Sequence, residues 1–204
     1  GCCGTTPDII RAMAERLPAL KPAQRRPQVK PMLASLFSAQ EMRQDPPPFF
    51  VGERANTNGS KQFRDYLLAE EWDGIVEVAR QQERTGAHGL DLCVAYTGRD
   101  ERADMRQAVM RIVRQVNLPI FIDSTDLRVI ETALKLIAGR PAINSINLED
   151  GEERAQRICH LAKRFGAELV ALTIDETGMA RTVEHKVAVA KRLYDIAVRQ
   201  NGLR

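Results

Sequence analysis

Five short apolar segments alternate with five longer amphipathic segments between residues 49 and 204. The apolar segments are typical of buried β-strands and comprise residues 49–53, 88–94, 119–123, 142–147 and 168–174. The longer segments repeat apolar residues at helical spacing and comprise residues 63–79, 102–116, 126–138, 151–165 and 182–199. Strands that alternate with helices in this way predict an α/β fold with a parallel sheet and crossover helices.

Polar residues gather where these predicted strands end. They are Gly52 and Glu53, Asp91, Asp123 and Ser124, Asn144 to Asn147, and Asp175 and Glu176. In a β/α barrel the carboxyl ends of the strands carry the active site. A doubly wound sheet would alternate as well, but its glycine-rich G-x-G-x-x-G turn does not occur in this sequence. The pattern therefore predicts a (β/α)8 TIM barrel.

The predicted barrel is incomplete. Residues 49–204 supply five β/α units, whereas a closed barrel has eight units in about 250 residues. We therefore expect a chain truncated at both ends, with three units missing after Arg204.

The first 48 residues have a different character. Residues 1–20 predict a turn and then a helix, which Thr6 or Asp8 caps and in which Pro7 occupies the first turn. Residues 21–48 are rich in proline and charge. Because proline interrupts regular elements, we expect a semi-rigid linker there.

Composition excludes several classes of protein. The chain has 204 residues, of which 44% are hydrophobic, so a wholly disordered protein is excluded. No window approaches the ~18 consecutive apolar residues of a membrane helix. A net charge of +3 with dispersed basic residues and 5% aromatics argues against a nucleic-acid partner. No signal peptide is visible and the four cysteines do not form a disulfide scaffold, so we expect a cytoplasmic protein.

Cys2 and Cys3 are the first candidate site. Two neighbouring thiolates can both bind one zinc ion, and the flanking glycines would let the backbone wrap closely around it. An incidental pair of cysteines is the alternative. The three histidines do not have the spacing of metal ligands; they are His88, His160 and His185.

Asp123 and Asn144 are candidates for recognition of a heterocycle. Capping of the next helix explains Ser124 or Asp126, but it does not explain a carboxylate at the end of an apolar strand. An ionised Asp123 could accept hydrogen bonds from an N–H and an NH₂ group that lie side by side. Asn144 could read such an edge with its amide or could be a satisfied amide of the core, and the sequence leaves both open.

The segment 52–61 combines charges, amides and glycine between the first strand and its helix. The backbone N–H groups of Gly59, Ser60 and Lys61 would suit an anion or a polar ring edge, although an ordinary capped loop has the same composition. Cys93 and Cys159 fit small buried residues better than nucleophiles.

Taken together, these motifs resemble those of the cobalamin-dependent methionine synthases. The resemblance follows family order and covers nearly the whole chain. The matching segments are GCCGTTPDII (1–10), FVGERANTNGSKQF (50–63), GLDLC (89–93), FIDST (121–125), INSINLEDGEER (143–154) and ALTIDETGMA (171–180).

The resemblance implies a division of the chain. Residues 1–20 would end a homocysteine-binding zinc domain, residues 21–48 would be a linker, and residues 49–204 would begin a pterin-binding domain. Cys2 and Cys3 would be two of three zinc thiolates, the third lying elsewhere. The residues that would contact tetrahydrofolate are Gly59, Ser60, Lys61, Asp123 and Asn144, with Asp91 as a lower-ranked addition.

The resemblance also implies a reaction. The methyl group of 5-methyltetrahydrofolate would pass to cob(I)alamin, giving methylcobalamin, and then to zinc-activated homocysteine, giving methionine. The cobalamin would be held by another module of the full-length chain. Asp123 would read the N–H edge of the pterin, and Asn144 would bond near N5 as that nitrogen is protonated; these two are the expected catalytic residues.

Three alternatives remain. Dihydropteroate synthases and corrinoid-dependent methyltetrahydrofolate methyltransferases share the pterin barrel but lack the GCCGTTP segment. A truncated, non-catalytic remnant is the third.

Overall fold

The computed structural model describes residues 4–21, 24 and 30–203, and the chain divides into two compact units, Gly1–Lys30 and Pro31–Arg204. The first unit contains helix α1 (Pro7–Arg16) and a 3-10 turn, η1 (Leu17–Ala19). The Thr6 hydroxyl accepts a hydrogen bond from the Ile9 amide at 3.4 Å. This contact confirms the predicted helix and its cap.

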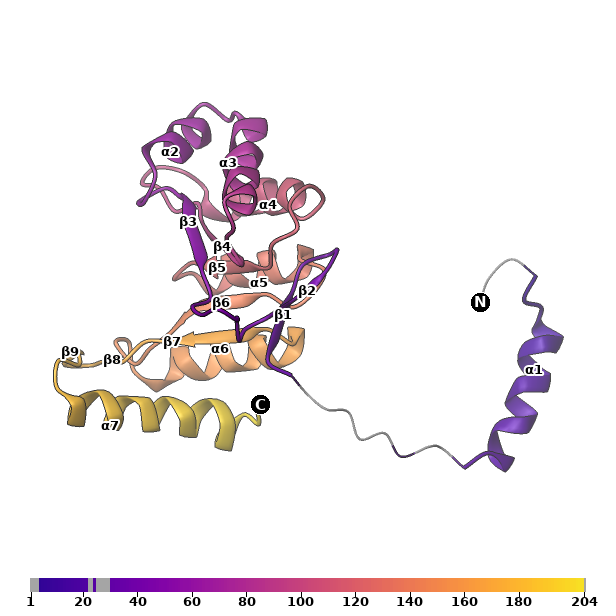
Figure 1. The fold of residues 1–204 in the computed structure, drawn as a ribbon. Coiled ribbons are helices and arrows are strands. Elements are labelled where there is room, and N and C mark those ends of the chain that lie inside the picture. The colour runs from indigo at the N-terminus through magenta and orange to yellow at the C-terminus, as the bar shows by residue number, and fades with distance from the viewer. Residues whose placement is uncertain (1–3, 22–23, 25–29, 204) are drawn as a thin grey trace. The chain divides into compact units, whose positions relative to one another are not determined.

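The second unit is built on a parallel sheet of five strands (Figure 1). The strands lie in the order in which they occur along the chain: β3 (Val51–Asn56), β4 (Gly89–Cys93), β5 (Ile120–Asp123), β6 (Ala142–Ile146) and β7 (Glu168–Ala171). Sequential neighbours joined through helices are the arrangement of a β/α barrel. The predicted partial barrel is thereby confirmed.

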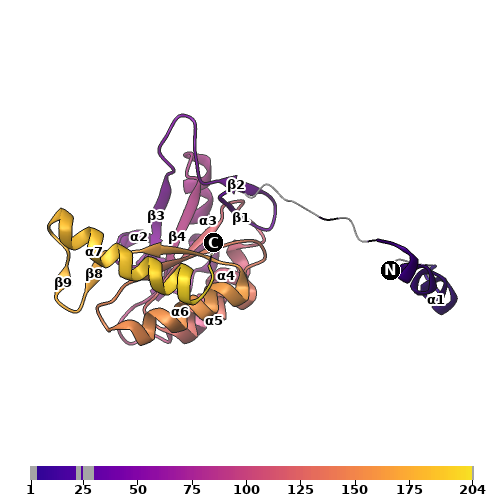
Figure 2. The same ribbon diagram turned by 90° about the horizontal axis from the view of Figure 1, so that it is seen from below.

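The connecting helices pack against the outward side of this sheet. They are α2 (Lys61–Leu68), α3 (Trp72–Arg84), α4 (Glu101–Ile112), α5 (Leu127–Leu136) and α6 (Glu152–Phe165). Helices α4, α5 and α6 run side by side (Figure 2). The segment that predicted one helix over residues 63–79 forms two, because the chain turns at Glu70, whose φ is +56°.

The last predicted strand and helix are also divided in the structure. Beyond β7 a small antiparallel hairpin forms from β8 (Ile174–Asp175) and β9 (Gly178–Met179). Helix α7 (Val183–Tyr194) then continues into a π-helical turn, η2 (Asp195–Gln200). None of the helices among the described residues is long and apolar enough to cross a membrane.

Side chains alternate between the two faces of the sheet. Outward residues join the helices in the main core; they include Leu90, Leu92, Ile120, Ile122 and Ile143, all 2% exposed or less. The intervening inward residues are apolar near the amino ends of the strands and polar near their carboxyl ends. This gradient separates a structural layer from a layer that carries chemistry.

A second hairpin covers the apolar inward layer. Strands β1 (Met32–Ala34) and β2 (Ala39–Glu41) pair antiparallel, and Leu33, which is fully buried, packs with Phe121 and Ala142. The amide of Ala34 donates to the Arg140 carbonyl at 3.0 Å, and the Arg140 amide donates back at 2.9 Å. The hairpin therefore belongs to the barrel unit.

This hairpin differs from the linker predicted for residues 21–48. The prolines exclude a long element, but they leave room for two strands of three residues each between Pro31 and Pro46. Gly139 has a φ of +115°, and a Cβ there would lie 2.4 Å from the Ala34 carbonyl oxygen. A glycine at residue 139 thus lets the hairpin approach the chain just before the amino end of β6.

Candidate functional site

Four polar side chains meet at the carboxyl ends of β3, β4, β5 and β6. The Asn56 Nδ2 group donates to Asp91 Oδ2 at 3.2 Å and to Asp123 Oδ2 at 3.1 Å. The Asn144 Nδ2 group donates to Asp91 Oδ1 at 3.0 Å. Asp123 and Asn144 are direct neighbours in the register of β5 and β6. The four side chains form one continuous network, which we call the polar layer.

Asn56 was not singled out by the sequence, and a β-bulge brings it into the polar layer. Gly52 pairs with Leu90 and Ala55 pairs with Leu92, so β3 has one more residue than β4 between these points. The extra residue reverses the alternation of β3 and directs Asn56 inward, opposite Cys93. Without the bulge, Asn56 would share the outward face with Gly52.

Gln82 of α3 stabilises this bulge. The Arg54 amide donates to Gln82 Oε1 at 2.7 Å, and Gln82 itself is 6% exposed. A Cβ at Gly52 would lie 2.5 Å from the same oxygen. Glycine at residue 52 therefore leaves the space in which the Gln82 side chain satisfies the bulged backbone.

Burial and nearby negative charge act on the two carboxyl groups, with Asp91 repelling Asp123 and Glu53 repelling Asp91. Burial, followed by the nearby charge of Asp91, raises the pKa of Asp123 to about 6, although hydrogen bonds from Cys93 and Asn56 oppose the shift. Burial also raises the pKa of Asp91, which the amides of Asn144 and Asn56 oppose. Asp91 is 6% exposed and Asp123 is half-buried, so Asp123 is the more accessible carboxylate.

Cys93 lies beside the polar layer and is not activated as a nucleophile. It is buried, and burial raises the pKa of its thiol to about 11. The same holds for Cys159, which is fully buried on α6 and has a pKa of about 11 for the same reason. Both cysteines are free thiols, in agreement with the expectation that they are small buried residues.

We expect both thiols to resist alkylation in the folded protein. At pH 8 the raised pKa lowers the thiolate fraction by about 100-fold relative to an ordinary cysteine, and burial lowers reactivity further. Mass spectrometry after iodoacetamide treatment would show Cys93 and Cys159 unmodified until urea is added. Native-state labelling of Cys93 at the rate seen in urea would contradict this environment.

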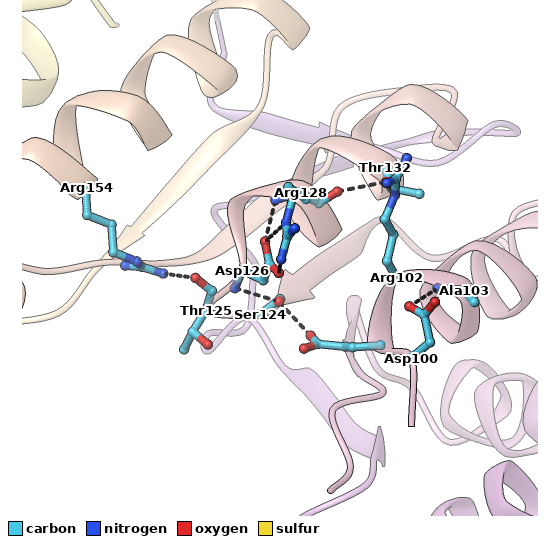
Figure 3. A network of polar contacts seen from close by, with 10 residues as sticks. Asp100, Arg102, Ala103, Ser124, Thr125, Asp126, Arg128, Thr132 and Arg154 are labelled. Atoms are coloured by element: carbon cyan, nitrogen blue, oxygen red, sulfur yellow. Dashed lines mark hydrogen bonds and ion pairs between the residues drawn. The ribbon is translucent and has the colours of Figure 1, made fainter. Parts of the chain in front are cut away.

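The loop that follows Asp123 is held in place from neighbouring helices (Figure 3). The Ser124 hydroxyl donates to Glu101 Oε1 at 2.6 Å and accepts from the Asp126 amide at 3.1 Å. Arg154 of α6 donates to the Thr125 carbonyl at 3.1 Å. Asp126 caps α5 as expected. These contacts fix the backbone next to Asp123 and so fix the direction of its carboxylate.

Of the three predicted loop residues, Gly59 and Ser60 contact Asn56 of the polar layer, whereas Lys61 pairs with Asp65. The Gly59 amide donates to Asn56 Oδ1 at 3.3 Å, and the Ser60 amide donates to the Asn56 carbonyl at 2.9 Å. Ser60 also caps α2. The Lys61 side chain is 80% exposed, and its ammonium group pairs with Asp65 at 2.6 Å. The loop therefore reaches the polar layer through Asn56.

The predicted zinc ligands Cys2 and Cys3 lie outside the described residues. Within residues 4–21, 24 and 30–203, no group of three or more His, Cys, Asp or Glu side chains could hold a metal ion.

A second ionic cluster ties the β8–β9 hairpin to α7. The Asp175 carboxylate accepts from the Thr177 amide at 2.9 Å and lies 2.8 Å from His185 Nε2, contacts that lower the pKa of Asp175. Arg192 of α7 bonds both oxygens of Glu176. These groups hold the segment after β7 against its helix.

Two carboxylates and two amides gathered at the carboxyl ends of adjacent strands suit a flat heterocycle that bears adjacent N–H donors. Comparisons with known proteins support this chemistry. Residues 52–204 match the family model described as pterin binding enzyme. The chain is 45% identical over 196 residues to the methionine synthase of Mycobacterium tuberculosis and 44% identical over 201 residues to that of Mycobacterium leprae.

Each alignment covers 95% of this chain but only 16% and 17% of those relatives, so the chain spans about one sixth of their length. A dihydropteroate synthase from Clostridium difficile, crystallised in the presence of pteroic acid, shares the fold. It superposes with a TM-score of 0.58 at 17% identity, over 76% of this chain and 60% of that structure. With three quarters of its length matched by the family model, this chain belongs to the pterin-binding enzymes.

Proposed function

We propose that this chain binds 5-methyltetrahydrofolate at the polar layer and presents its N5-methyl group for transfer to cob(I)alamin. The observation that carries the proposal is the network of Asn56, Asp91, Asp123 and Asn144 at the carboxyl ends of adjacent barrel strands. The similarity to two methionine synthases over 95% of the chain favours methyl transfer over other pterin reactions.

Asp123 supplies the recognition of the ring edge in this proposal. A pterin carries a ring N–H and an exocyclic NH₂ group side by side, and one ionised carboxylate can accept both hydrogen bonds. Asp123 is the accessible carboxylate of the layer, while Asp91 is occupied by the amides of Asn56 and Asn144. Asp91 therefore orients the amides, and Asp123 binds the ring.

Asn144 supplies the contact near N5. N5 of the substrate is a tertiary amine and a poor leaving group, so the methyl group departs only when N5 is protonated. Because the amide nitrogen of Asn144 is held by Asp91, its carbonyl oxygen can accept a hydrogen bond from the protonated N5. That bond forms as positive charge develops on the ring and so favours the transition state.

Replacement of Asn144 by alanine should reduce the rate of methyl transfer on the order of 100-fold. Binding of 5-methyltetrahydrofolate should weaken by only about fivefold, because the bond to N5 forms only on protonation and the ground state loses only the hydrogen bond from Asn144 to Asp91. Single-turnover transfer to added cob(I)alamin and equilibrium binding by calorimetry would measure the two effects separately.

The matched control is Asn117→Ala. Asn117 accepts hydrogen bonds from Ser35 and Ser38 at the opposite end of the barrel, and its loss should leave both quantities unchanged. Equal losses in binding and transfer for Asn144→Ala would refute its role at N5.

The wider reaction belongs to the same proposal. Cys2 and Cys3 would contribute two thiolates to a zinc ion that activates homocysteine for attack on the methyl group carried by methylcobalamin, and the protein would act in the cytoplasm. The third thiolate and the cobalamin module would lie outside these 204 residues. The relatives named methionine synthase support this extension, since their length exceeds that of the chain about sixfold.

A further inference from the structure

Asn56 occupies the centre of the polar layer. Its Nδ2 group donates one hydrogen bond to Asp91 and one to Asp123, and its Oδ1 atom accepts from the amides of Asn58 at 2.9 Å and Gly59 at 3.3 Å. The residue is 6% exposed. The two N–H groups and the oxygen of this side chain are therefore all used, and they join Asp91, Asp123 and the loop after β3.

We infer that Asn56 is a positioning residue, whose amide holds the Asp91 and Asp123 carboxylates on a shared donor and keeps Asp123 ready to accept the N–H edge of a pterin. The inference rests on the proposed function for the identity of the ligand. It assigns to Asn56 a role that acts through Asp123 rather than through direct contact with the ring.

Electrostatics explain why two carboxylates need such a donor. Two buried negative charges repel each other, and without compensation one of them would take up a proton near neutral pH. The two N–H groups of a single amide lie between the carboxylates and stabilise both charges at once. A carboxylic acid at Asp123 would offer a proton where the pterin edge also offers protons, so the ionised form is the one that binds.

The surroundings leave this task to few other groups. Glu53 and Glu101 add negative charge near Asp91 and Asp123 respectively. The Cys93 thiol and the Asn144 amide are neutral donors, each serving one carboxylate. Of the groups that act on Asp123, Asn56 is the donor that also bonds Asp91.

The test is the titration of the Asp123 carboxyl group in the ligand-free protein, followed by ¹³C NMR and assigned with Asp123→Asn. In Asn56→Ala the midpoint should rise by about one pH unit, because the lost hydrogen bond favours the ionised form by that order. In Asn56→Asp the rise should be larger, because a third carboxylate replaces the donor. Asn56→Asp keeps an oxygen that can accept from Asn58 and Gly59, so it retains the loop contacts.

The matched control is Asn201→Ala. Asn201 is 5% exposed, and its amide donates to Gln156 and Ile196, away from the polar layer. Its removal should cost stability to a similar degree and leave the Asp123 midpoint unchanged. Thermal melts of all variants would verify that each protein is folded at the temperature of the titration.

Binding of 5-methyltetrahydrofolate provides the second readout. Affinity in Asn56→Ala should fall about fivefold more at pH 6 than at pH 8, in step with a midpoint raised by about one unit, and the difference should be larger in Asn56→Asp. An unchanged Asp123 midpoint in both Asn56 variants would overturn the inference even if the pterin binds. A shifted midpoint in a protein that does not bind 5-methyltetrahydrofolate would uphold the positioning role and overturn the proposed function.

Discussion

Replacement of Asp123 by asparagine is expected to weaken 5-methyltetrahydrofolate binding at pH 8 by about 10- to 100-fold. A hydrogen bond to an ionised acceptor contributes about 1.5–3 kcal/mol, and the neutral amide turns an NH₂ group toward donors of the ring. The substitution preserves the volume of the side chain. Titration calorimetry at pH 8, where the wild-type carboxyl group is ionised, would measure the loss.

The same pair of proteins should differ in their dependence on pH. Because the pKa of Asp123 is raised to about 6, its carboxylate is ionised above pH 6 and takes up a proton below it. Wild-type affinity should therefore fall as the pH drops through 6, by about tenfold for each further unit. Asp123→Asn should not show this fall in affinity at low pH, which we call the acid limb. Because any titration of the ligand affects both proteins equally, it cancels when their affinities are compared.

Asp126→Asn is the control for this prediction. Asp126 lies in the same loop and caps α5, and its partly exposed carboxylate pairs with Arg128 at 3.0 Å. Its replacement should lower stability slightly and leave the acid limb in place. An acid limb that persists in Asp123→Asn would assign the titration to another group, with Asp91 as the nearest candidate.

Replacement of Leu33 by alanine is expected to reduce the free energy of unfolding by about 2–5 kcal/mol. Leu33 is fully buried against Phe121 and Ala142 in the apolar inward layer, where its removal leaves a cavity. In a protein of this size the loss corresponds to a fall in Tm of about 4–20 °C. Urea denaturation and a thermal melt, each followed by circular dichroism, would measure the free energy of unfolding and the Tm respectively.

Leu36→Ala tests whether the effect comes from burial. Leu36 lies in the turn of the same hairpin and is 51% exposed, so its replacement should change the free energy of unfolding by less than about 0.5 kcal/mol. Equal stability of the two variants would show that residues 31–41 are a linker, as the sequence predicts, and do not cover the barrel.

Much of the fold could be predicted because the relevant signals are local. The alternation of apolar strands with helical periodicity located β4, β5 and β6 to within about two residues. Thr6 and Asp126, each one of two candidate caps in the sequence, do begin their helices, since capping depends on three or four neighbouring residues. The predicted boundaries were wrong where helical spacing of apolar residues continues across a turn, as in the segment 63–79, which the turn at Glu70 divides into two helices.

The candidate site was predicted in part. Asp91, Asp123 and Asn144 could be found because polar residues at the carboxyl ends of parallel strands converge. Asn56 was missed because its direction depends on one extra residue in β3, a bulge whose backbone is satisfied by the contact of Gln82 with the Arg54 amide. A signal was present in the segment GERANTNGSK, where Gly52 precedes a run of polar residues in a predicted strand.

The order of the elements, the barrel architecture and the chemical types at the strand ends can be predicted from the sequence, because these follow from periodicity and composition. The hydrogen-bonded partners of each side chain depend on the tertiary structure. It put Asn56 between two carboxylates, raised the pKa of Asp123 through burial, and made residues 32–41 a cover for the barrel. Each of these depends on contacts between segments far apart in the chain, which no local pattern encodes.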